Sequence, residues 1–226
     1  MNKIKYKIKN LFGKVLDLIY PFDVSCAMCG EEIKEAVGSG ICEDCSKFIE
    51  PIEDGRVVYD KLKVYSYTQY QDVARKIVLQ EKDSNKPYLT DTTVFYLNKL
   101  IVNYNIEADY IAYVPSSKRN LKRRGYDAMK IVATKLSERV GIPLLKNFER
   151  IKDSVDQTET ETTEERIENV KGCFSYKGKP LNGKRILIID DVITTGATLN
   201  ECAEVLQKSN PLQVSGLTFC RASVCI

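Results

Sequence analysis

The second half of the chain alternates between strand-like and helix-like patterns. Residues 186–189 are an uninterrupted apolar run, which is typical of a strand buried on both faces, and residues 110–114 and 214–220 are further apolar strands. Apolar side chains at helical spacing cover residues 129–140 and 198–207. This alternation predicts a parallel sheet flanked by helices, an α/β fold in which ligands bind at the carboxyl ends of the strands.

The first half of the chain carries weaker structural signals. Residues 57–59 and 62–67 predict a short hairpin, and helical patterns begin near Val73 and again over residues 96–102. The polar residues 80–87 predict a loop between these two helices. Nothing in this part of the sequence points to a chemical role.

The first twenty residues form a basic amphipathic pattern that predicts a helix. Its apolar positions follow a 4-3-4-3 spacing: Ile4, Ile8, Leu11, Val15 and Leu18. Five lysines and one aspartate give this segment a net charge of +4, against +3 for the whole chain. Such a segment could reach an anionic partner or the inner face of a membrane, but docking on its own domain explains the pattern more simply.

The targeting signals favour the cytoplasm. Lysines interrupt the N-terminal apolar positions, which is unlike a secretory signal, and no stretch approaches the roughly 18 apolar residues of a membrane span. We therefore expect a cytoplasmic protein without an integral membrane span, in which the eight cysteines need an explanation other than disulfides.

Length and composition indicate one main domain with an appendage. The chain has 226 residues, of which 43% are hydrophobic, so it can bury a sizeable core. It contains no histidine, which excludes histidine-based triads, zinc catalytic sites with histidine ligands and histidine proton shuttles. We divide the chain into four parts: a basic helix (1–22), a cysteine ribbon (23–50), a hairpin and helical connector (51–105) and the α/β domain (106–226).

Four of the cysteines are arranged as two hooks. Cys26 and Cys29 form one CxxC turn, and Cys42 and Cys45 form another after a gap of twelve residues. Two such turns can direct four thiolates at one ion, and this pattern predicts a closed structural Zn²⁺ site without an open position for catalysis. A redox CxxC or plain buried thiols are the alternatives. The remaining cysteines are scattered and predict small core residues: Cys173, Cys202, Cys220 and Cys225.

The most informative stretch is residues 186–198, where a buried strand ends in Asp190 and Asp191 and leads through a short loop into a helix. The backbone N–H groups of the loop and the helix dipole suit a phosphate monoester, and Gly196 allows close approach. Threonine hydroxyls add donors, and the two carboxylates could accept hydrogen bonds from ribose hydroxyls. A Walker motif is absent. An ordinary strand–turn–helix with solvated acids is the competing interpretation.

This stretch resembles the phosphoribosyl-pyrophosphate (PRPP) signature of type I phosphoribosyltransferases. The wider chain is similar to the ComF family, in particular its ComFC branch, which is associated with natural transformation and joins a four-cysteine ribbon to a phosphoribosyltransferase domain. Beside the cysteine hooks and the PRPP stretch, the matching residues span most of the chain: Val114, Pro115, Lys122, Arg123, Arg124, Gly125, Tyr126, Gln157, Arg166, Asn169, Val170 and Phe174. Two departures are Ser116–Lys118, where the family pattern has histidine, and Asp127-Ala128, where it has Asn-Gln.

The resemblance implies a PRPP site in which Asp190 and Asp191 are catalytic, holding the ribose and supporting positive charge on its ring. Mg²⁺ would bridge pyrophosphate and ribose oxygens while a nitrogen nucleophile displaces pyrophosphate. Lys118, Arg123 and Arg124 could neutralise the diphosphate. Thr194 stands where purine-salvage members carry Asp, which argues against purine salvage. The implied PRPP-binding residues are Ser116, Ser117, Lys118, Asp190, Asp191, Thr194, Thr195, Gly196, Ala197 and Thr198.

A second hypothesis is that the chain handles nucleic acid. Five of the seven residues 118–124 are basic and Tyr126 follows, a combination that suits phosphate neutralisation with base stacking on single-stranded DNA. The nucleic-acid or diphosphate residues are Lys118, Arg119, Lys122, Arg123, Arg124 and Tyr126. The acidic residues 153–168 predict a hood over the site. The resemblance implies incoming single-stranded DNA as substrate, with a ComFA-type helicase and a recombination mediator as partners; an active phosphoribosyltransferase is the alternative.

Overall fold

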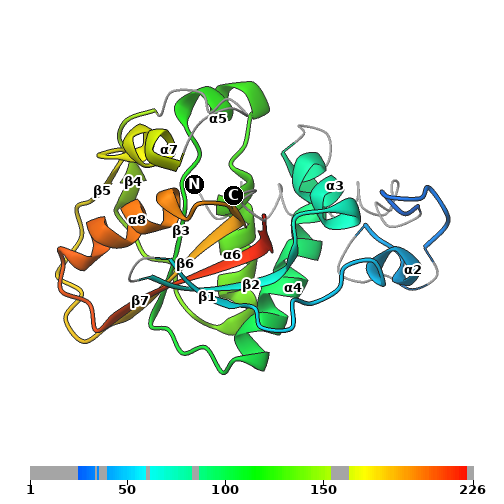
Figure 1. Cartoon of the computed structure of the whole chain (residues 1–226), viewed down its shortest axis with the longest axis horizontal. Coiled ribbons are helices and arrows are strands. Elements are labelled where there is room, and N and C mark those ends of the chain that lie inside the picture. Colours follow the sequence, from blue (N-terminus) through cyan, green and yellow to red (C-terminus); the bar gives the residue numbers. More distant parts are fainter. Residues whose placement is uncertain are drawn as a thin grey trace, which may run out of the picture.

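A five-stranded sheet in the order β1-β2-β7-β6-β3 forms the centre of the protein (Figure 1). The computed structural model describes residues 25–33, 35, 40–59, 62–82, 87–153 and 163–222. The basic segment 1–22, Gln157, the side chain of Arg166, and Cys225 lie outside the described residues, as does most of the acidic segment 153–168.

The predicted strands and helices are present, but α4 begins six residues before the predicted helix and β6 ends four residues after the predicted strand. The strands are β1 (Arg56–Tyr59), β2 (Leu62–Gln69), β3 (Tyr110–Tyr113), β4 (Phe148–Arg150), β5 (Phe174–Tyr176), β6 (Arg185–Ile193) and β7 (Gln213–Arg221). The helices are α2 (Glu43–Ser46), α3 (Asp72–Glu81), the 3₁₀ turn η1 (Pro87–Leu89), α4 (Thr90–Asn103), α5 (Lys118–Arg124), α6 (Ala128–Val140), α7 (Thr163–Val170) and α8 (Ala197–Gln207).

Four strands of the sheet are parallel: β2 pairs with β7, β7 with β6, and β6 with β3, while β1 is antiparallel to β2. The apolar run 186–189 has a strand on either side and lies fully inside this sheet. Its side chains alternate between the two faces, since Leu187 and Ile189 belong to one apolar cluster while Ile186 and Ile188 belong to the other. This double burial explains why the strand has no polar position in the run.

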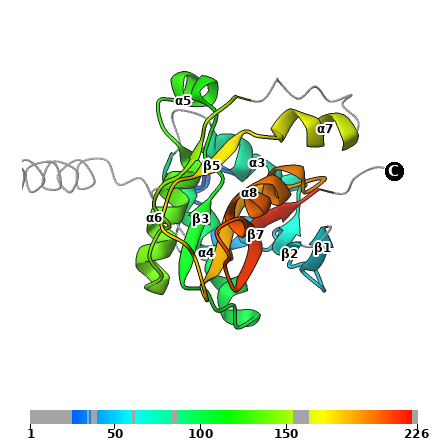
Figure 2. The same ribbon diagram turned by 90° about the vertical axis from the view of Figure 1, so that its left-hand side faces the viewer.

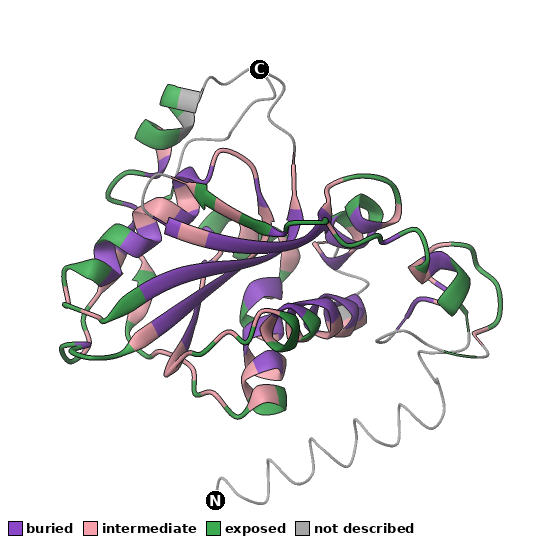
Figure 3. Ribbon diagram, turned by 60° about the horizontal axis from the view of Figure 1, so that its bottom comes forward, coloured by how far each residue is buried: buried purple, intermediate pink, exposed green. Residues whose placement is uncertain are grey.

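Helices cover both faces of the sheet. Figure 2 shows α6 and α8 on opposite sides of the strands, with α5 and α7 above one end of the sheet. The first cluster joins the sheet to α3, α4 and α6, and the second joins it to α8 and β5. Burial colours in Figure 3 follow this division, because the strands and the inward faces of the helices are buried while α7 is largely exposed. The predicted parallel α/β fold with flanking helices is confirmed.

Several details differ from the sequence-based expectations. The hairpin β1–β2 extends the main sheet, because β2 pairs in parallel with β7 from Lys63↔Ser215 to Gln69↔Arg221. Helix α3 continues to Glu81, so the polar stretch 80–87 that predicted a loop begins inside a helix. The helices α5 and α7 and the small β4–β5 sheet were not predicted, since their sequences are too polar or too short to show a clear apolar period.

Candidate functional site

The site lies at the carboxyl end of β6, which extends beyond its neighbour β3. The last pair between the two strands is Tyr113↔Ile189, whereas β6 continues to pair with β7 as far as Ile193↔Arg221. Asp190 and Asp191 fall in this extension and are both partly exposed. The carboxylates therefore stand at the sheet edge from which β3 has already turned away, as the position of the motif predicted.

The loop after the two acids leads directly into α8. Gly196 is the N-cap of α8 with φ +79°, a left-handed conformation that suits glycine. A pocket of about 210 Å³ opens here, lined by residues 190–199 and Lys82. All the predicted PRPP residues from Asp190 to Thr198 are thus brought together at the N-terminus of an eleven-residue helix, where backbone N–H groups and the helix dipole favour an anion.

Tyr59 at the end of β1 closes one wall of this loop. A Cβ atom on residue 196 would lie 2.8 Å from Cδ1 of the Tyr59 ring, so the aromatic ring packs directly on the Gly196 backbone. Glycine is therefore required at this position for two reasons, the left-handed backbone and the lack of room. Sequence analysis found the glycine but not Tyr59, because the contact depends on the placement of β1 in the sheet.

Lys82 is a pocket-lining residue that the sequence analysis missed. It follows the last residue of α3, and its Nζ lies 2.7 Å from Oδ2 of Asp191. The Asp191 N–H also donates to Oδ1 of Asp190, at 3.0 Å. Burial raises the pKa of Asp190, the charge of Asp191 raises it further, and Lys82 opposes this only in part. Burial alone would lower the pKa of Lys82, but its attraction to Asp191 more than offsets that effect.

The residue before Lys82 anchors this end of α3. Glu81 is buried, with 2% of its surface exposed, and its Oε1 accepts a hydrogen bond of 2.5 Å from the Thr93 hydroxyl of α4. The hydroxyl of Tyr126 donates to the backbone carbonyl of Glu81. Burial raises the pKa of the Glu81 carboxyl to about 8. The end of α3 is thereby tied to α4 and to the turn between α5 and α6.

The loop after β3 is held by the protein's own carboxylates. Both the N–H and the hydroxyl of Ser116 donate to Asp127, at 3.2 and 3.0 Å, and Asp127 also caps α6. Ser117 caps α5 by accepting the Asn120 N–H, and the Lys118 N–H donates to Asp153 at 2.9 Å. The backbone N–H groups of Ser116 and Lys118, two residues of the implied PRPP site, are thus occupied by two aspartates.

The basic run 118–124 forms helix α5. Its residues Lys118, Arg119, Lys122 and Arg123 are exposed, whereas Arg124 is partly buried. The Nε atom of Arg124 is buried and has no hydrogen-bond partner among the described residues. Burial lowers the pKa of Arg124, and the charge of Asp191 acts in the opposite direction. Arg124 is therefore close enough to Asp191 for the two charges to interact, while the other four basic residues are exposed. The hydroxyl of Tyr126 is engaged with α3.

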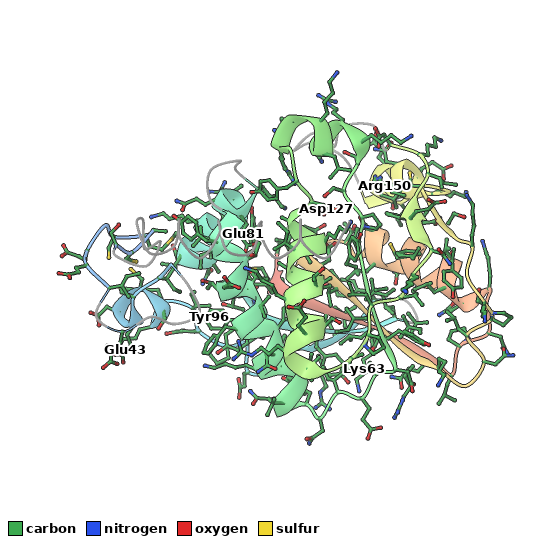
Figure 4. All side chains as sticks on the ribbon, turned by 180° about the vertical axis from the view of Figure 1, so that it is seen from behind. Glu43, Lys63, Glu81, Tyr96, Asp127 and Arg150 are labelled. Atoms are coloured by element: carbon green, nitrogen blue, oxygen red, sulfur yellow. The ribbon has the colours of Figure 1, made fainter. Side chains whose placement is uncertain are left out.

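Arg150 on β4 also acts electrostatically on Asp190. Its guanidinium carbon lies 5.1 Å from the centre of the Phe174 ring, and its charge lowers the pKa of Asp190, against the stronger effect of burial. Figure 4 shows Glu81, Asp127 and Arg150 toward the end of the sheet where α5 lies. No local sequence signal marked Arg150, since β4 is only three residues long.

The two cysteine hooks converge as predicted. The sulfur atoms of Cys26, Cys29, Cys42 and Cys45 all lie within 4.8 Å of one another, and those of Cys29 and Cys42 are 3.8 Å apart. Four sulfurs at ~2.3 Å from a tetrahedral Zn²⁺ would be ~3.8 Å apart, so the cluster fits such an ion. Burial raises the pKa of Cys26, but N–H donors from neighbouring backbone outweigh it and hold the pKa below its usual value. The cluster can hold a metal ion.

The ribbon is joined to the main core. Cys26, Ile41, Cys45 and Ile49 belong to the same apolar cluster as α4, and this cluster includes Tyr96, which carries a stacked ring contact to Phe219 of β7. The cysteines at 173, 202 and 220 are buried in the core, as predicted. The ribbon is therefore packed against the α/β domain.

Comparisons with known proteins agree with this architecture. The phosphoribosyl transferase domain family matches residues 121–225. Competence protein ComFC of Bacillus subtilis is 24% identical over 92% of this chain and 89% of its own length. Competence protein F of Haemophilus influenzae is 36% identical over 42% of this chain and 43% of its length. DNA utilization protein YhgH of Escherichia coli is 28% identical over 50% of this chain and 49% of its length.

Within the described residues, no helix is long and apolar enough to cross a membrane. The four-cysteine cluster precedes the matched domain along the chain. The B. subtilis relative aligns with almost the whole chain. The chain is therefore ComFC-like, with a four-cysteine ribbon ahead of a type I phosphoribosyltransferase-like domain.

Proposed function

We propose that this chain is a cytoplasmic ComFC-like protein of natural transformation that handles incoming single-stranded DNA and binds PRPP, or a related 5-phosphoribosyl ligand, at the end of β6. The observation that carries the ligand proposal is the pocket in which Asp190, Asp191 and the Gly196 N-cap of α8 meet. The two ends of this pocket differ in chemistry, and each matches one part of the ligand.

The phosphate end is the loop from Thr194 to Thr198. The left-handed Gly196 lets the backbone approach an anion closely, and the first N–H groups of α8 have no intrahelical partners, so they can donate to a 5-phosphate. The sugar end is formed by Asp190 and Asp191, whose carboxylate oxygens can accept hydrogen bonds from two ribose hydroxyls.

The same carboxylates suit a divalent cation, since Mg²⁺ prefers carboxylate oxygens together with those of a bound phosphate. Mg²⁺ bound with the diphosphate would neutralise its charge. The protein's own contribution is to hold the ribose with Asp190 and Asp191, and to place positive charge nearby through Lys82 and Arg124. At the ribbon, the distances between the sulfurs support a structural Zn²⁺.

Binding without turnover is the proposal, and an active phosphoribosyltransferase remains the alternative. The hydrogen bonds of Ser116 and Lys118 to Asp127 and Asp153 argue against turnover, because these backbone donors are not open to a departing pyrophosphate. The acceptor of an active enzyme would be a nitrogen nucleophile of unknown identity.

The proposed DNA surface is the outer face of α5. Four basic side chains are exposed within seven residues, and a single strand can be held by such charges without sequence preference. The relatives named as competence and DNA utilization proteins support this assignment. A helicase and a recombination mediator are the partners we propose, with the ribbon as a docking surface.

Calorimetric titration of Mg²⁺–PRPP into the full chain tests the ligand proposal. We expect saturable binding that falls at least ~100-fold in the Asp190→Asn/Asp191→Asn double variant. Absence of binding at millimolar PRPP, or equal binding by the variant, would exclude this pocket. Release of pyrophosphate in the presence of a base, lost in the variant, would favour the alternative.

Fluorescence anisotropy with a single-stranded oligonucleotide at 50 and 200 mM salt tests the DNA surface. A Lys118→Gln/Lys122→Gln/Arg123→Gln variant should weaken binding at least tenfold and reduce its salt dependence. A control with Arg139→Gln, Lys179→Gln and Lys208→Gln removes the same charge from exposed positions elsewhere. Equal losses in both variants would contradict a specific surface on α5.

A further inference from the structure

The Lys82–Asp191 ion pair stands inside the pocket, and the proposed function leaves open what the pair does before a ligand binds. Lys82 comes from α3, in the first half of the chain, whereas the rest of the pocket lining comes from β6, α8 and the loop between them. The distance of 2.7 Å between Nζ of Lys82 and Oδ2 of Asp191 is that of a direct charge-assisted hydrogen bond. The Asp191 side chain retains only 14% of its exposure, so this pair is poorly screened by solvent.

The backbone that leads into Lys82 is anchored at Glu81. The Glu81 carbonyl accepts the Tyr126 hydroxyl, and the Glu81 side chain accepts the Thr93 hydroxyl. The lysine stem therefore starts from an anchored point, and only its flexible side chain is free to change partner. Its ammonium group has three N–H donors and a positive charge, and it can pair either with a carboxylate or with a phosphate.

The charges of the pocket explain what the lysine does there. Two adjacent carboxylates repel each other, and Lys82 neutralises one of them in the pocket as it stands. A free divalent cation that approaches Asp191 must first displace the ammonium group. A cation that arrives with a diphosphate brings a new anionic partner for Lys82. The ion pair that Lys82 then forms with the diphosphate compensates for the loss of its pair with Asp191.

We propose that Lys82 is a specificity-determining counter-ion, which holds Asp191 against free metal ions and moves to the ligand's diphosphate when a metal–phosphate complex enters. This inference rests on the proposed PRPP function for its second half only. The first half, the exclusion of free metal, depends on the ion pair alone. No covalent bond is made or broken in this exchange, because the ammonium group only changes its anionic partner.

Lys82→Met tests the proposal, because methionine keeps an unbranched stem and removes the charge. The matched control is Lys135→Met, since Lys135 forms a pair of the same 2.7 Å with Asp91 outside the pocket lining. Free Mn²⁺, measured by electron paramagnetic resonance without other ligand, should bind the Lys82→Met variant at least tenfold more tightly than the wild type. Mg²⁺–PRPP, measured by calorimetry, should bind the same variant at least tenfold more weakly. The control should change neither affinity.

Each half of the proposal can fail separately. Unchanged Mn²⁺ affinity in Lys82→Met would overturn the exclusion of free metal, and unchanged PRPP affinity would overturn the exchange. If the wild type binds no PRPP, the proposed function fails, whereas the Mn²⁺ measurement still decides the role of the ion pair. Lys82→Gln gives the same comparison if the methionine variant does not fold, and Lys82→Arg should restore resistance to free Mn²⁺.

Discussion

The four-cysteine cluster and the acidic pocket are two polar sites built in opposite ways. All four sulfurs come from two short hooks in one ribbon, and they face one another closely enough to surround an ion completely. The pocket gathers Lys82 from α3 and the acids from β6, and it stays open on one side. A closed site suits structure and an open, charged one suits a ligand, so we place the chemistry of this protein in the pocket and stability in the ribbon.

The two regions are nevertheless connected through one core. The ribbon residues Cys26 and Cys45 pack in the same apolar cluster as α3 and α4, and α3 is followed directly by Lys82 in the pocket. Damage at the ribbon should therefore reduce the stability of the whole protein. Damage at the pocket should change ligand binding with a smaller effect on stability.

Loss of the proposed zinc ion should have the largest effect. In Cys29→Ser, one exposed ligand is replaced, and we expect the zinc content to fall well below one per chain. Structural zinc contributes many kcal/mol to folding, so the unfolding midpoint should fall by about 10 °C or more. Metal analysis and thermal unfolding check this. Cys202→Ala, which removes a buried thiol outside the cluster, should keep its zinc. Full zinc content in Cys29→Ser would contradict the view that the four cysteines form a closed structural zinc site.

The buried carboxyl of Glu81 should make stability depend on pH. Burial raises its pKa to about 8, whereas an exposed glutamate has a pKa of ~4.3. The folded state therefore holds a proton that the unfolded chain releases, so this stabilisation is complete below pH ~4 and is lost as pH rises towards 8. Between pH 6 and 9 the loss should be about 2–3 kcal/mol.

Glu81→Gln stays neutral and should remove this part of the pH dependence. Urea unfolding of both proteins at pH 6 and pH 9 measures the difference directly. Asp190 also has a raised pKa and contributes with the same sign in both proteins, so the comparison isolates Glu81. Identical slopes in the two proteins would show that Glu81 is already ionised at neutral pH.

Gly196→Ala should have a smaller effect on stability and a clear effect on the pocket. The left-handed backbone costs an alanine about 1–2 kcal/mol, and its Cβ would also press on the Tyr59 ring. Gly183→Ala is the matched control, because Gly183 has φ +69° and open space around it. Both variants should lower the unfolding midpoint by a few degrees, and only Gly196→Ala should weaken phosphate-ligand binding, by about tenfold. Equal ligand affinity in both variants would show that the loop containing Gly196 does not contact the ligand.

The same comparison explains what could be predicted from the sequence. The cysteine hooks and the strand–acid–loop–helix of residues 186–198 depend on neighbours along the chain. The hooks were recognised from their spacing, and residues 186–198 from their residue pattern and its resemblance to the PRPP signature. The parallel pairing of β2 with β7 depends on contacts between distant segments, so the role of the hairpin in the sheet was missed. The contact of Tyr59 with Gly196 was missed for the same reason.

Charged residues were the hardest to place. Lys82 looks like any lysine after an amphipathic helix, and nothing nearby in the sequence indicates that it reaches Asp191. Likewise, Asp127 and Asp153 gave no sign that they would occupy the donors of the loop after β3. These partners are set by the packing of α3, α5 and α6 around the sheet edge, which a single sequence does not specify.

A crystal structure of the full chain with Mg²⁺ and PRPP tests the central claim most directly. The account predicts the 5-phosphate within ~2.7–3.2 Å of backbone nitrogens at the start of α8, the ribose hydroxyls on Asp190 and Asp191, and Nζ of Lys82 moved from Asp191 to the diphosphate. A ligand bound elsewhere, or bound here with the Lys82–Asp191 distance still at 2.7 Å, would contradict it.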